Sequence, residues 1–283
     1  MVTTTQSNQR NKRSSNPSAS TVKIQQIAVI LINQLATYFP ELNKVPGVLA
    51  RVMAQMQFES SFHVYWVRNG VTTSRGLGRS PCNGLLRESG FSAFRSANRN
   101  NPAVQEGIED HFWAHSLGQC MGYHLIKGNK DSSALYKIYS KFIDATGIQV
   151  PLGTPLTPIF TDPANGMARG VAAGLMMTDY MYQAQLKKGK PKGEATLLLA
   201  MQRYLGAPGV PDSLGTTPEM RLAQIMNPSS SAYKMLEAAG IRYNGTYTGP
   251  TTITASTGEA TSTPGATSTA STTPGKMPGC VSA

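Results

Sequence analysis

Apolar residues recur at helical spacing from about residue 24 to residue 239, and this periodicity constrains the fold more than any other feature of the chain. Pro40 is expected to end a first helix whose apolar face carries Ile24, Ile27, Leu31 and Leu35. A second helix should begin after Pro46. Later helices are predicted over residues 133–146, 166–186, 194–205, 218–226 and 231–239. No stretch alternates between apolar and polar residues like a strand with a hairpin turn beside it, so the sequence predicts a mainly α fold.

The two ends of the chain have compositions that cannot form a core. Residues 1–20 are rich in Ser, Thr, Asn and Gln, and residues 245–283 are mostly Thr, Ser, Gly, Pro and Ala. Such segments bury too little apolar surface to offset the entropy lost when a chain is ordered. We therefore predict a disordered arm over 1–20, one globular domain over 21–244 and a flexible tail over 245–283. Within the domain, residues 66–112 are rich in Gly, Asn, Ser and Arg and are predicted to be an insertion.

The 26 Lys and Arg residues outnumber the 15 Asp and Glu residues and give a net charge of +11. This excess attracts polyanions such as nucleic acid, anionic lipid or the acidic bacterial wall. The basic residues are scattered, without zinc-finger spacing or an RNP-type motif, so nucleic acid is not expected as a partner. Polar residues interrupt the apolar run at 27–32 well short of the roughly 20 residues that a bilayer requires, so no membrane span is expected.

Cysteine and histidine spacing indicates no metal site. The three cysteines, Cys82, Cys120 and Cys280, are irregularly spaced and predict neither a disulfide framework nor a metal quartet. His111 and His115 stand four residues apart, which on a helix would place two metal ligands on one face. The chain lacks the HExxH glutamate and an evident third ligand, so packing roles are favoured for both. No metal ion and no organic cofactor are expected.

Glu59 is the residue that points to chemistry. It follows Met56 by three residues and Val52 by seven, so helical geometry places it on the apolar face of the second helix. Burial raises the pKa of a carboxyl group towards neutrality, and a glycosidic oxygen needs a protonated acid in order to leave. The alternative is that the helix has ended by Glu59 and that its side chain turns to solvent, as most glutamates do.

The residues around Glu59 resemble a known family. Residues 59–62, Glu-Ser-Ser-Phe, match the Glu-Ser-x-Phe pattern that ends the catalytic helix of soluble lytic transglycosylases and their goose-type lysozyme relatives. The family's Gly-Leu-Met-Gln turn, which lines the sugar cleft, is similar to residues 116–119, Ser-Leu-Gly-Gln. This turn lies further from Glu59 than the family shows, which implies an insertion between them. Residues 74–79 are the alternative, at a more usual distance but with Arg79 in place of the glutamine.

Two further resemblances follow in the family's order. Residues 162–165, Asp-Pro-Ala-Asn, are similar to the family's Asp-Pro helix start. Residues 200–209 are similar to its Ala-x-x-x-Tyr-Asn-x-Gly element, with Leu205 where many members have Asn, in the Tyr-Leu-Gly form of phage-encoded members. The resemblance spans about residues 41–210 and implies that Tyr204 approaches the catalytic carboxyl group.

The resemblance implies a lysozyme-like helical domain that acts as a peptidoglycan lytic transglycosylase. Glu59 would protonate the oxygen between MurNAc and GlcNAc and then take the proton of the MurNAc C6 hydroxyl, which closes on C1 to leave a 1,6-anhydro sugar. The substrate would be the glycan strands of peptidoglycan. The residues that would contact this substrate are Ser60, Ser116, Gly118, Gln119, Met121 and Tyr204.

Two other functions stay open, a muramidase that adds water and a structural tail or baseplate protein that keeps the fold without catalysis. The N-terminus lacks the apolar core and cleavage site of a secretory signal, so another route must carry the protein to the wall. Together with the Tyr-Leu-Gly element and the low-complexity ends, this indicates a phage virion protein that acts on the periplasmic wall alongside other tail or baseplate proteins. An enzyme resident in the bacterial periplasm is the alternative.

Overall fold

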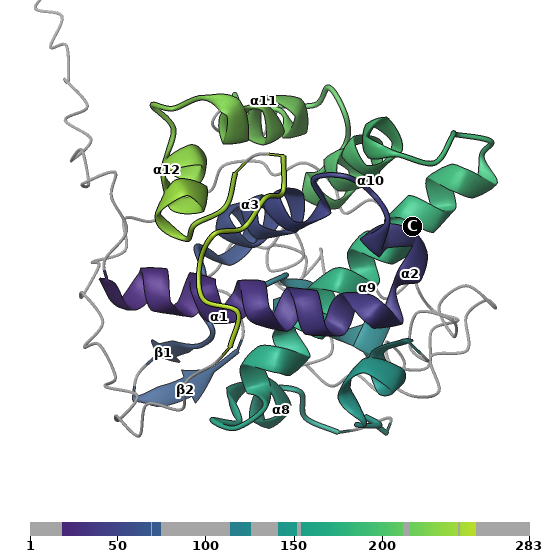
Figure 1. The fold of residues 1–283 in the computed structure, drawn as a ribbon. Helices are drawn as coiled ribbons and strands as arrows, with labels where there is room; N and C mark the ends of the chain where they lie inside the picture. The colour runs from purple at the N-terminus through teal and green to yellow at the C-terminus, as the bar shows by residue number, and fades with distance from the viewer. Residues whose placement is uncertain are drawn as a thin grey trace, which may run out of the picture.

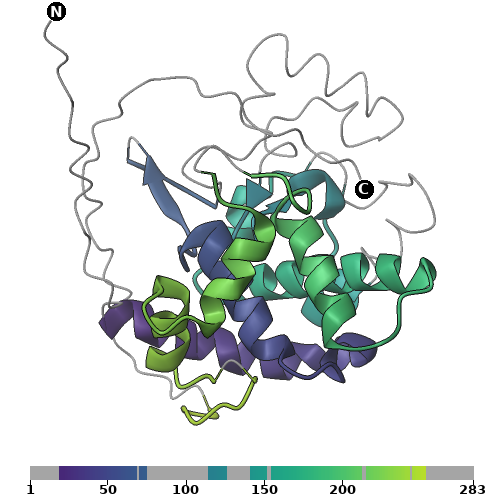
Figure 2. The same ribbon diagram turned by 90° about the horizontal axis from the view of Figure 1, so that it is seen from above.

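The computed structural model shows a mainly helical fold built around one central helix (Figures 1 and 2). Its described residues are 19–68, 70–74, 114–125, 141–151, 154–211, 215–242 and 244–252. The central helix is α9 (Gly166–Lys187), in which every residue from 170 to 179 is buried. This is expected of a helix that is enclosed on all sides. The helices packed around it are α1 (Ala19–Leu35), α3 (Val48–Ser60), α8 (Thr157–Thr161) and α10 (Glu194–Leu205).

Short helices close the remaining sides of the core. Pro40 begins α2 (Pro40–Asn43), which joins α1 to α3 after the 3-10 helix η1 (Ala36–Tyr38). Thr217 and Ser230 stand just before two further α-helices and cap them. The hydroxyl of each accepts a hydrogen bond from the backbone N–H of the third residue of its helix. The elements that pack across α3 are α11 (Pro218–Ala223), the 3-10 helix η4 (Gln224–Met226) and α12 (Ser231–Ala238).

The predicted helices after residue 166 are confirmed to within one residue at each end, with the last turn of the 218–226 helix formed as 3-10 helix. Residues 141–146 are helical, and the rest of the predicted 133–146 helix lies outside the described residues. The first helix differs from its prediction. It already begins at Ala19, two residues inside the predicted arm, and it ends at Leu35, before Pro40. Proline lacks an N–H, so it is tolerated at the start of a helix, and Pro40 occupies that position in α2.

One short hairpin lies within the predicted insertion of residues 66–112, and a second follows it. One pairs β1 (Trp66–Arg68) with β2 (Val71–Thr73), and the other pairs β3 (Ala114–His115) with β4 (Cys120–Met121), which leads into the 3-10 helix η3 (Gly122–Leu125). The Ser116 N–H donates to the carbonyl of Ser74 at 3.0 Å. Ser74 and Ser116, which stand on either side of the residues that are not described, therefore lie next to each other.

The helical body continues past the predicted domain end at residue 244. Ile241 and Tyr247 form an isolated bridge, and the Thr248 N–H donates to the Gly240 carbonyl at 2.8 Å. Tyr247 is partly buried against the core, which provides the apolar contact that the Thr- and Gly-rich composition did not suggest. Residues 245–252 therefore belong to the folded part of the chain. None of the helices described is long and apolar enough to cross a membrane.

Candidate active site

Glu59 lies in the last turn of α3, just before the chain turns sharply. Ser61 and Phe62 both adopt positive φ angles, 51° and 61°, and the buried Phe62 anchors this turn in the core. Ser60 is buried as well, and its hydroxyl donates to the carbonyl of Met56 at 3.0 Å. The Ser60 hydroxyl is therefore used within the helix, and the structure does not bring it among the polar groups around Glu59.

The Glu59 carboxyl group is held in a desolvated position. The residue keeps part of its surface open to solvent, yet the surrounding protein raises its pKa from the usual 4.5 to about 8. The guanidinium group of Arg221, in α11, acts in the opposite direction and has a smaller effect on this pKa. At pH 7 Glu59 therefore carries its proton while it remains partly accessible, as a general acid must.

Tyr204, in the last turn of α10, brings a hydroxyl group close to Glu59. This hydroxyl donates to the carbonyl of Gly118 at 2.5 Å and lies 3.3 Å from the Cys120 sulfur. Because the tyrosine proton is engaged by Gly118, the thiol is the donor in the second contact. Burial, followed by the nearby Cys120 and Glu59, raises the pKa of Tyr204 well above its usual value. The tyrosine thus stays neutral near Glu59.

The turn between β3 and β4 closes against Tyr204 and α9. Ser116 and Gln119 adopt positive φ angles of 61° and 48°, and the Gln119 amide donates to the Ser116 carbonyl at 2.6 Å. A β-carbon at Gly118 would lie 2.8 Å from the Gly174 Cα and 3.0 Å from the Tyr204 hydroxyl. Only glycine allows so close an approach at position 118.

The two segments that resembled the family's second motif are described to different extents. Residues 116–119 contact Tyr204 through Gly118, and Ser74, the first residue of the other segment, contacts Ser116 and His115. Residues 75–79 lie outside the described residues. The backbone of Met121 belongs to β4 and pairs with Ala114.

Three polar residues at the site were missed by sequence analysis. Gln55 lies one turn before Glu59 and is buried, and its side chain acts to lower the pKa of Tyr204, against the larger effect of burial. Its amide oxygen accepts from the Thr178 hydroxyl of α9 at 3.3 Å. Arg221 and Cys120 are the other two. Only Gln55 left a signal in the sequence, because a glutamine four residues before Glu59 falls on the same apolar helix face.

The remaining candidate ligands have structural roles. His115 is fully buried in a strand, so the helical spacing that would have paired it with His111 does not apply, and His111 lies outside the described residues. The His115 ring lies 2.7 Å from the Ser74 hydroxyl and stacks on Phe160. Burial raises the pKa of the free Cys120 thiol to about 12, which leaves a neutral thiol. Among the residues described, no group of three or more potential ligands could hold a metal ion.

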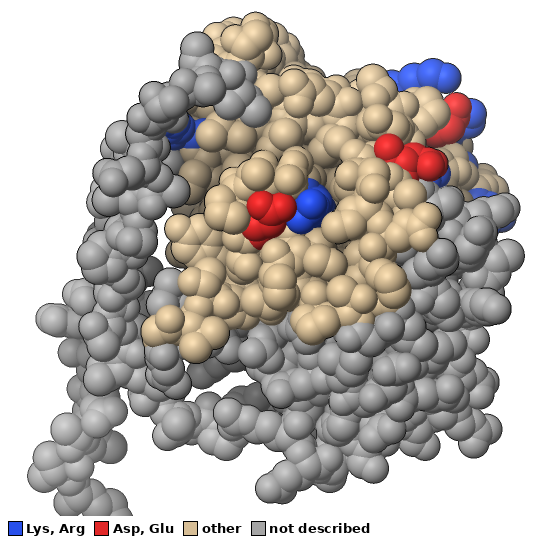
Figure 3. Space-filling view, turned by 90° about the horizontal axis from the view of Figure 1, so that it is seen from below, with Lys and Arg blue, Asp and Glu red and all other residues tan. Residues whose placement is uncertain are grey.

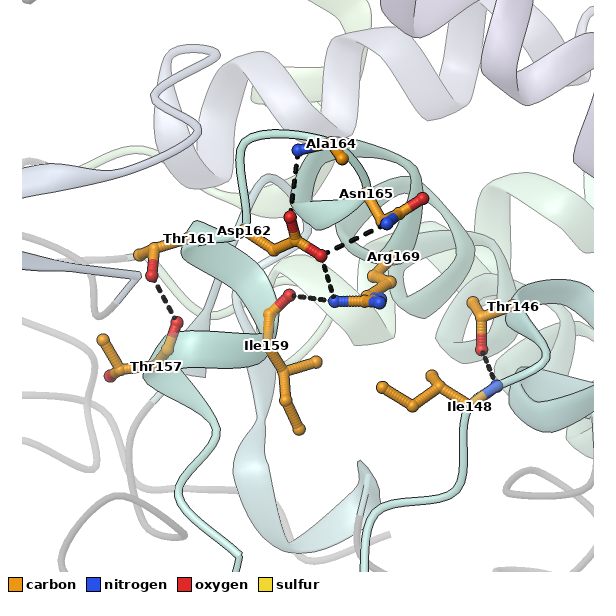
Figure 4. Close-up of polar contacts among 9 residues, drawn as sticks. All are labelled: Thr146, Ile148, Thr157, Ile159, Thr161, Asp162, Ala164, Asn165 and Arg169. Carbon is orange, nitrogen blue, oxygen red and sulfur yellow. Dashed lines mark hydrogen bonds and ion pairs between the residues drawn. The ribbon is translucent and has the colours of Figure 1, made fainter.

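Asp162, at the family-like helix start, organises the beginning of α9 (Figure 4). Its carboxylate accepts from the Ala164 N–H at 2.9 Å, from the Asn165 amide at 3.2 Å and from Arg169 at 2.9 Å. Arg169 also donates to the Ile159 carbonyl at 3.0 Å, which ties the end of α8 to α9. These hydrogen bonds lower the pKa of Asp162, led by the one from Ala164. Asp162 therefore holds the helix that supports Gly118.

Tyr204→Phe is expected to lower the free energy of unfolding by about 1–3 kcal/mol. The change leaves the Gly118 carbonyl without its donor and the Cys120 thiol without its acceptor. Urea denaturation would measure the loss. Tyr38→Phe, at a tyrosine that is 44 % exposed, is the control and should change stability little. Equal effects of the two substitutions would show that the Tyr204 hydroxyl is not a structural link.

Gly170→Ala is expected to destabilise the fold by about 2–3 kcal/mol, because the new methyl group would meet Ser116. A β-carbon at Gly170 would lie 1.9 Å from the Ser116 hydroxyl oxygen, which has no hydrogen-bond partner among the described residues. In a Ser116→Gly background the new methyl group meets no serine side chain. Gly170→Ala should then raise the free energy of unfolding by about 1 kcal/mol, because alanine favours the helix over glycine. A double-mutant cycle by urea denaturation would measure this reversal. If the effects of Gly170→Ala and Ser116→Gly on the free energy of unfolding simply add, the two residues are not in contact.

Function has to be inferred from this geometry. Comparisons of the chain with protein-family models, with curated proteins and with solved structures find no match.

Proposed function

We propose that this protein is a peptidoglycan lytic transglycosylase with a lysozyme-like helical domain. The observation that carries the proposal is the carboxyl group of Glu59, which burial keeps protonated at neutral pH beside the hydroxyl of Tyr204. A desolvated carboxylic acid at the end of a helix, partly open to solvent, suits the protonation of a glycosidic oxygen.

The convergence of segments that lie far apart in the sequence also supports the proposal. The four motifs that resemble the family are separated by long stretches of chain, yet three of them meet near Glu59 through Gly118 and Tyr204. The fourth begins α9, whose Gly174 packs against Gly118 and Met56. A chance set of short matches would have no reason to assemble in one place.

The proposed mechanism uses a single carboxyl group. Ordinary glycosidases place a second carboxylate across the scissile bond as nucleophile or base. Among the described residues, the charged group that acts on the pKa of Glu59 is Arg221, and no described acid does so. The acids nearest after Glu59 in the sequence, Glu88, Glu106, Glu109 and Asp110, lie outside the described residues, so the route in which the substrate's own hydroxyl attacks is taken from the family resemblance.

In that route Glu59 gives its proton to the oxygen that links MurNAc C1 to GlcNAc, and the C1–O bond breaks. The MurNAc acetamido group shields the cationic centre at C1. The Glu59 carboxylate, stabilised by the nearby Arg221 cation, then takes the proton of the MurNAc C6 hydroxyl as its oxygen bonds to C1. The acid is regenerated, no water is consumed, and the product carries a 1,6-anhydro ring.

Mass analysis of muropeptides released from purified peptidoglycan tests the proposal. We expect 1,6-anhydroMurNAc ends without an added water. Products with an added water and a reducing end would make the protein a muramidase. A zymogram with no cleared band would instead favour a structural protein that keeps the fold without catalysis.

We further propose that the protein acts from a phage particle, since the Tyr-Leu-Gly element at residues 204–206 is similar to that of phage-encoded members of the family. Detection of the chain in purified particles by mass spectrometry would support this setting. Its presence only in the periplasm of uninfected bacteria would contradict it.

A further inference from the structure

The turn between α9 and α10 carries a dense cluster of positive charge. Residues 187–193 read Lys-Lys-Gly-Lys-Pro-Lys-Gly, and all four lysines are exposed. Lys44, which follows α2, lies beside them, because it lines an open pocket of about 300 Å³ together with Lys192 and Gly193. We call these five residues the lysine patch: Lys44, Lys187, Lys188, Lys190 and Lys192. Four of these lysines are already neighbours in the sequence, and the fold adds Lys44 to them.

Little negative charge offsets the lysine patch. Glu41 lines the same pocket and bridges two members of the patch, with its carboxylate 2.5 Å from the Lys192 nitrogen and 3.5 Å from that of Lys44. The hydrogen bond from Lys192 leads the effects that lower the pKa of Glu41, so this group is a carboxylate at neutral pH. Glu194, the next acid along the chain, is paired with Arg51. Among the described residues, these five lysines and the Glu41 carboxylate together carry a net charge of +4.

The lysine patch and Glu59 lie at opposite ends of the same two helices. The patch adjoins the starts of α3 and α10, whereas Glu59 and Tyr204 lie in their last turns. Figure 1 shows α2, which precedes α3, on the right and the β1–β2 hairpin, which follows α3, on the left. At about 1.5 Å per residue, the length of α3 separates the patch from Glu59 by roughly 20 Å. Figure 3 shows the molecule from below, where few of the described side chains carry a charge.

The composition of the turn selects the kind of anion. It contains only lysine, glycine and proline, so it offers no aromatic ring on which a base could stack and no apolar side chain to enter a lipid bilayer. Lysine is a point charge without the planar fork with which arginine grips a phosphate. Such a surface suits a hydrated polymer with repeated single charges.

We propose that the lysine patch binds the carboxylates of peptidoglycan peptide stems and so holds the wall polymer roughly 20 Å from the bond that Glu59 cleaves. The choice of polymer rests on the proposed function, whereas the patch itself does not. Binding through exposed lysines should weaken steeply with salt, since the Debye length falls to about 8 Å at physiological ionic strength.

Binding to purified peptidoglycan sacculi tests the proposal in a Glu59→Gln background, where cleavage does not interfere. A patch variant that replaces Lys187, Lys188 and Lys190 with Gln should bind about 10- to 100-fold more weakly at low salt, with a shallower salt dependence. Glu41→Gln removes the carboxylate that occupies two lysines and should strengthen binding by about threefold. The control variant removes the same number of charges elsewhere, by replacing with Gln the residues Lys23, Lys234 and Arg242.

The outcomes separate the lysine patch from general charge and from other partners. Equal losses in the patch and control variants would overturn the proposal, because net charge alone would then explain binding. If the patch variant loses retention on DNA or on phosphatidylserine vesicles while its binding to sacculi is unchanged, the proposal is also overturned. If the protein with Glu59 intact cleaves no peptidoglycan but the patch variant still loses binding, the proposed enzymatic function fails and the lysine patch stands.

Discussion

Glu59→Gln is expected to abolish the release of muropeptides from purified peptidoglycan, with a loss of about 10³-fold or more in turnover. A neutral amide has no acidic proton for the bridging oxygen and no basic oxygen for the C6 hydroxyl proton. Both halves of the proposed cycle therefore fail together. The amide has nearly the shape of the protonated acid, so the fold should be kept.

The matched control for this loss is Glu237→Gln, at an exposed glutamate of α12. It makes the same chemical change away from the site and should retain wild-type turnover. Circular dichroism of both variants would verify that they are folded. Wild-type turnover in Glu59→Gln would show that a different group supplies the proton.

Glu59→Gln is also expected to stabilise the folded protein at neutral and alkaline pH. Burial raises the pKa of Glu59 from 4.5 to about 8 in the folded state. Between these values the folded protein holds a proton that the unfolded chain releases, so the contribution of Glu59 to the free energy of unfolding is greatest below pH 4.5 and is lost as the pH rises through 8. A glutamine has no such proton. The advantage of Glu59→Gln should be near zero at acidic pH and on the order of 2–3 kcal/mol at pH 7.

Urea denaturation over a series of pH values would measure this difference between the variant and the wild type. The advantage of the variant should level off once the wild-type carboxyl group is ionised in both states. Glu237→Gln, measured in parallel, should have nearly the same free energy of unfolding as the wild type at every pH. A stability difference between Glu59→Gln and the wild type that does not change with pH would mean that Glu59 is not desolvated.

The helices could be predicted from the sequence where apolar periodicity and end signals agree. Both signals are strong for α9 and α10, each of which is bounded by Gly or Pro residues. Prediction failed where stability comes from distant contacts. Residues 245–252 look like a low-complexity tail, but Tyr247 finds a place against the core. The start of α1 at Ala19 is likewise invisible in a composition dominated by Ser and Thr.

The candidate site was predictable only in part for the same reason. Helical periodicity alone placed Glu59 on a buried face, while the proximity of Tyr204 came from the family resemblance. The contact between Cys120 and Tyr204 joins residues 84 positions apart, and the one between Gln55 and Thr178 joins residues 123 positions apart. No local pattern encodes such pairs, because they depend on how α3, α9 and α10 pack. The lysine patch also forms only when α2 and the α9–α10 turn come together.

Titration of the Glu59 carboxyl group by ¹³C NMR tests the proposed mechanism most directly. Selective labelling of glutamate, with Glu59→Gln to assign the signal, would follow this one group in the folded protein. The structure leads us to expect a midpoint near pH 8. A midpoint near the ordinary value of 4.5 would mean that the group is ionised at neutral pH, and Glu59 could not then be the acid that starts the cleavage.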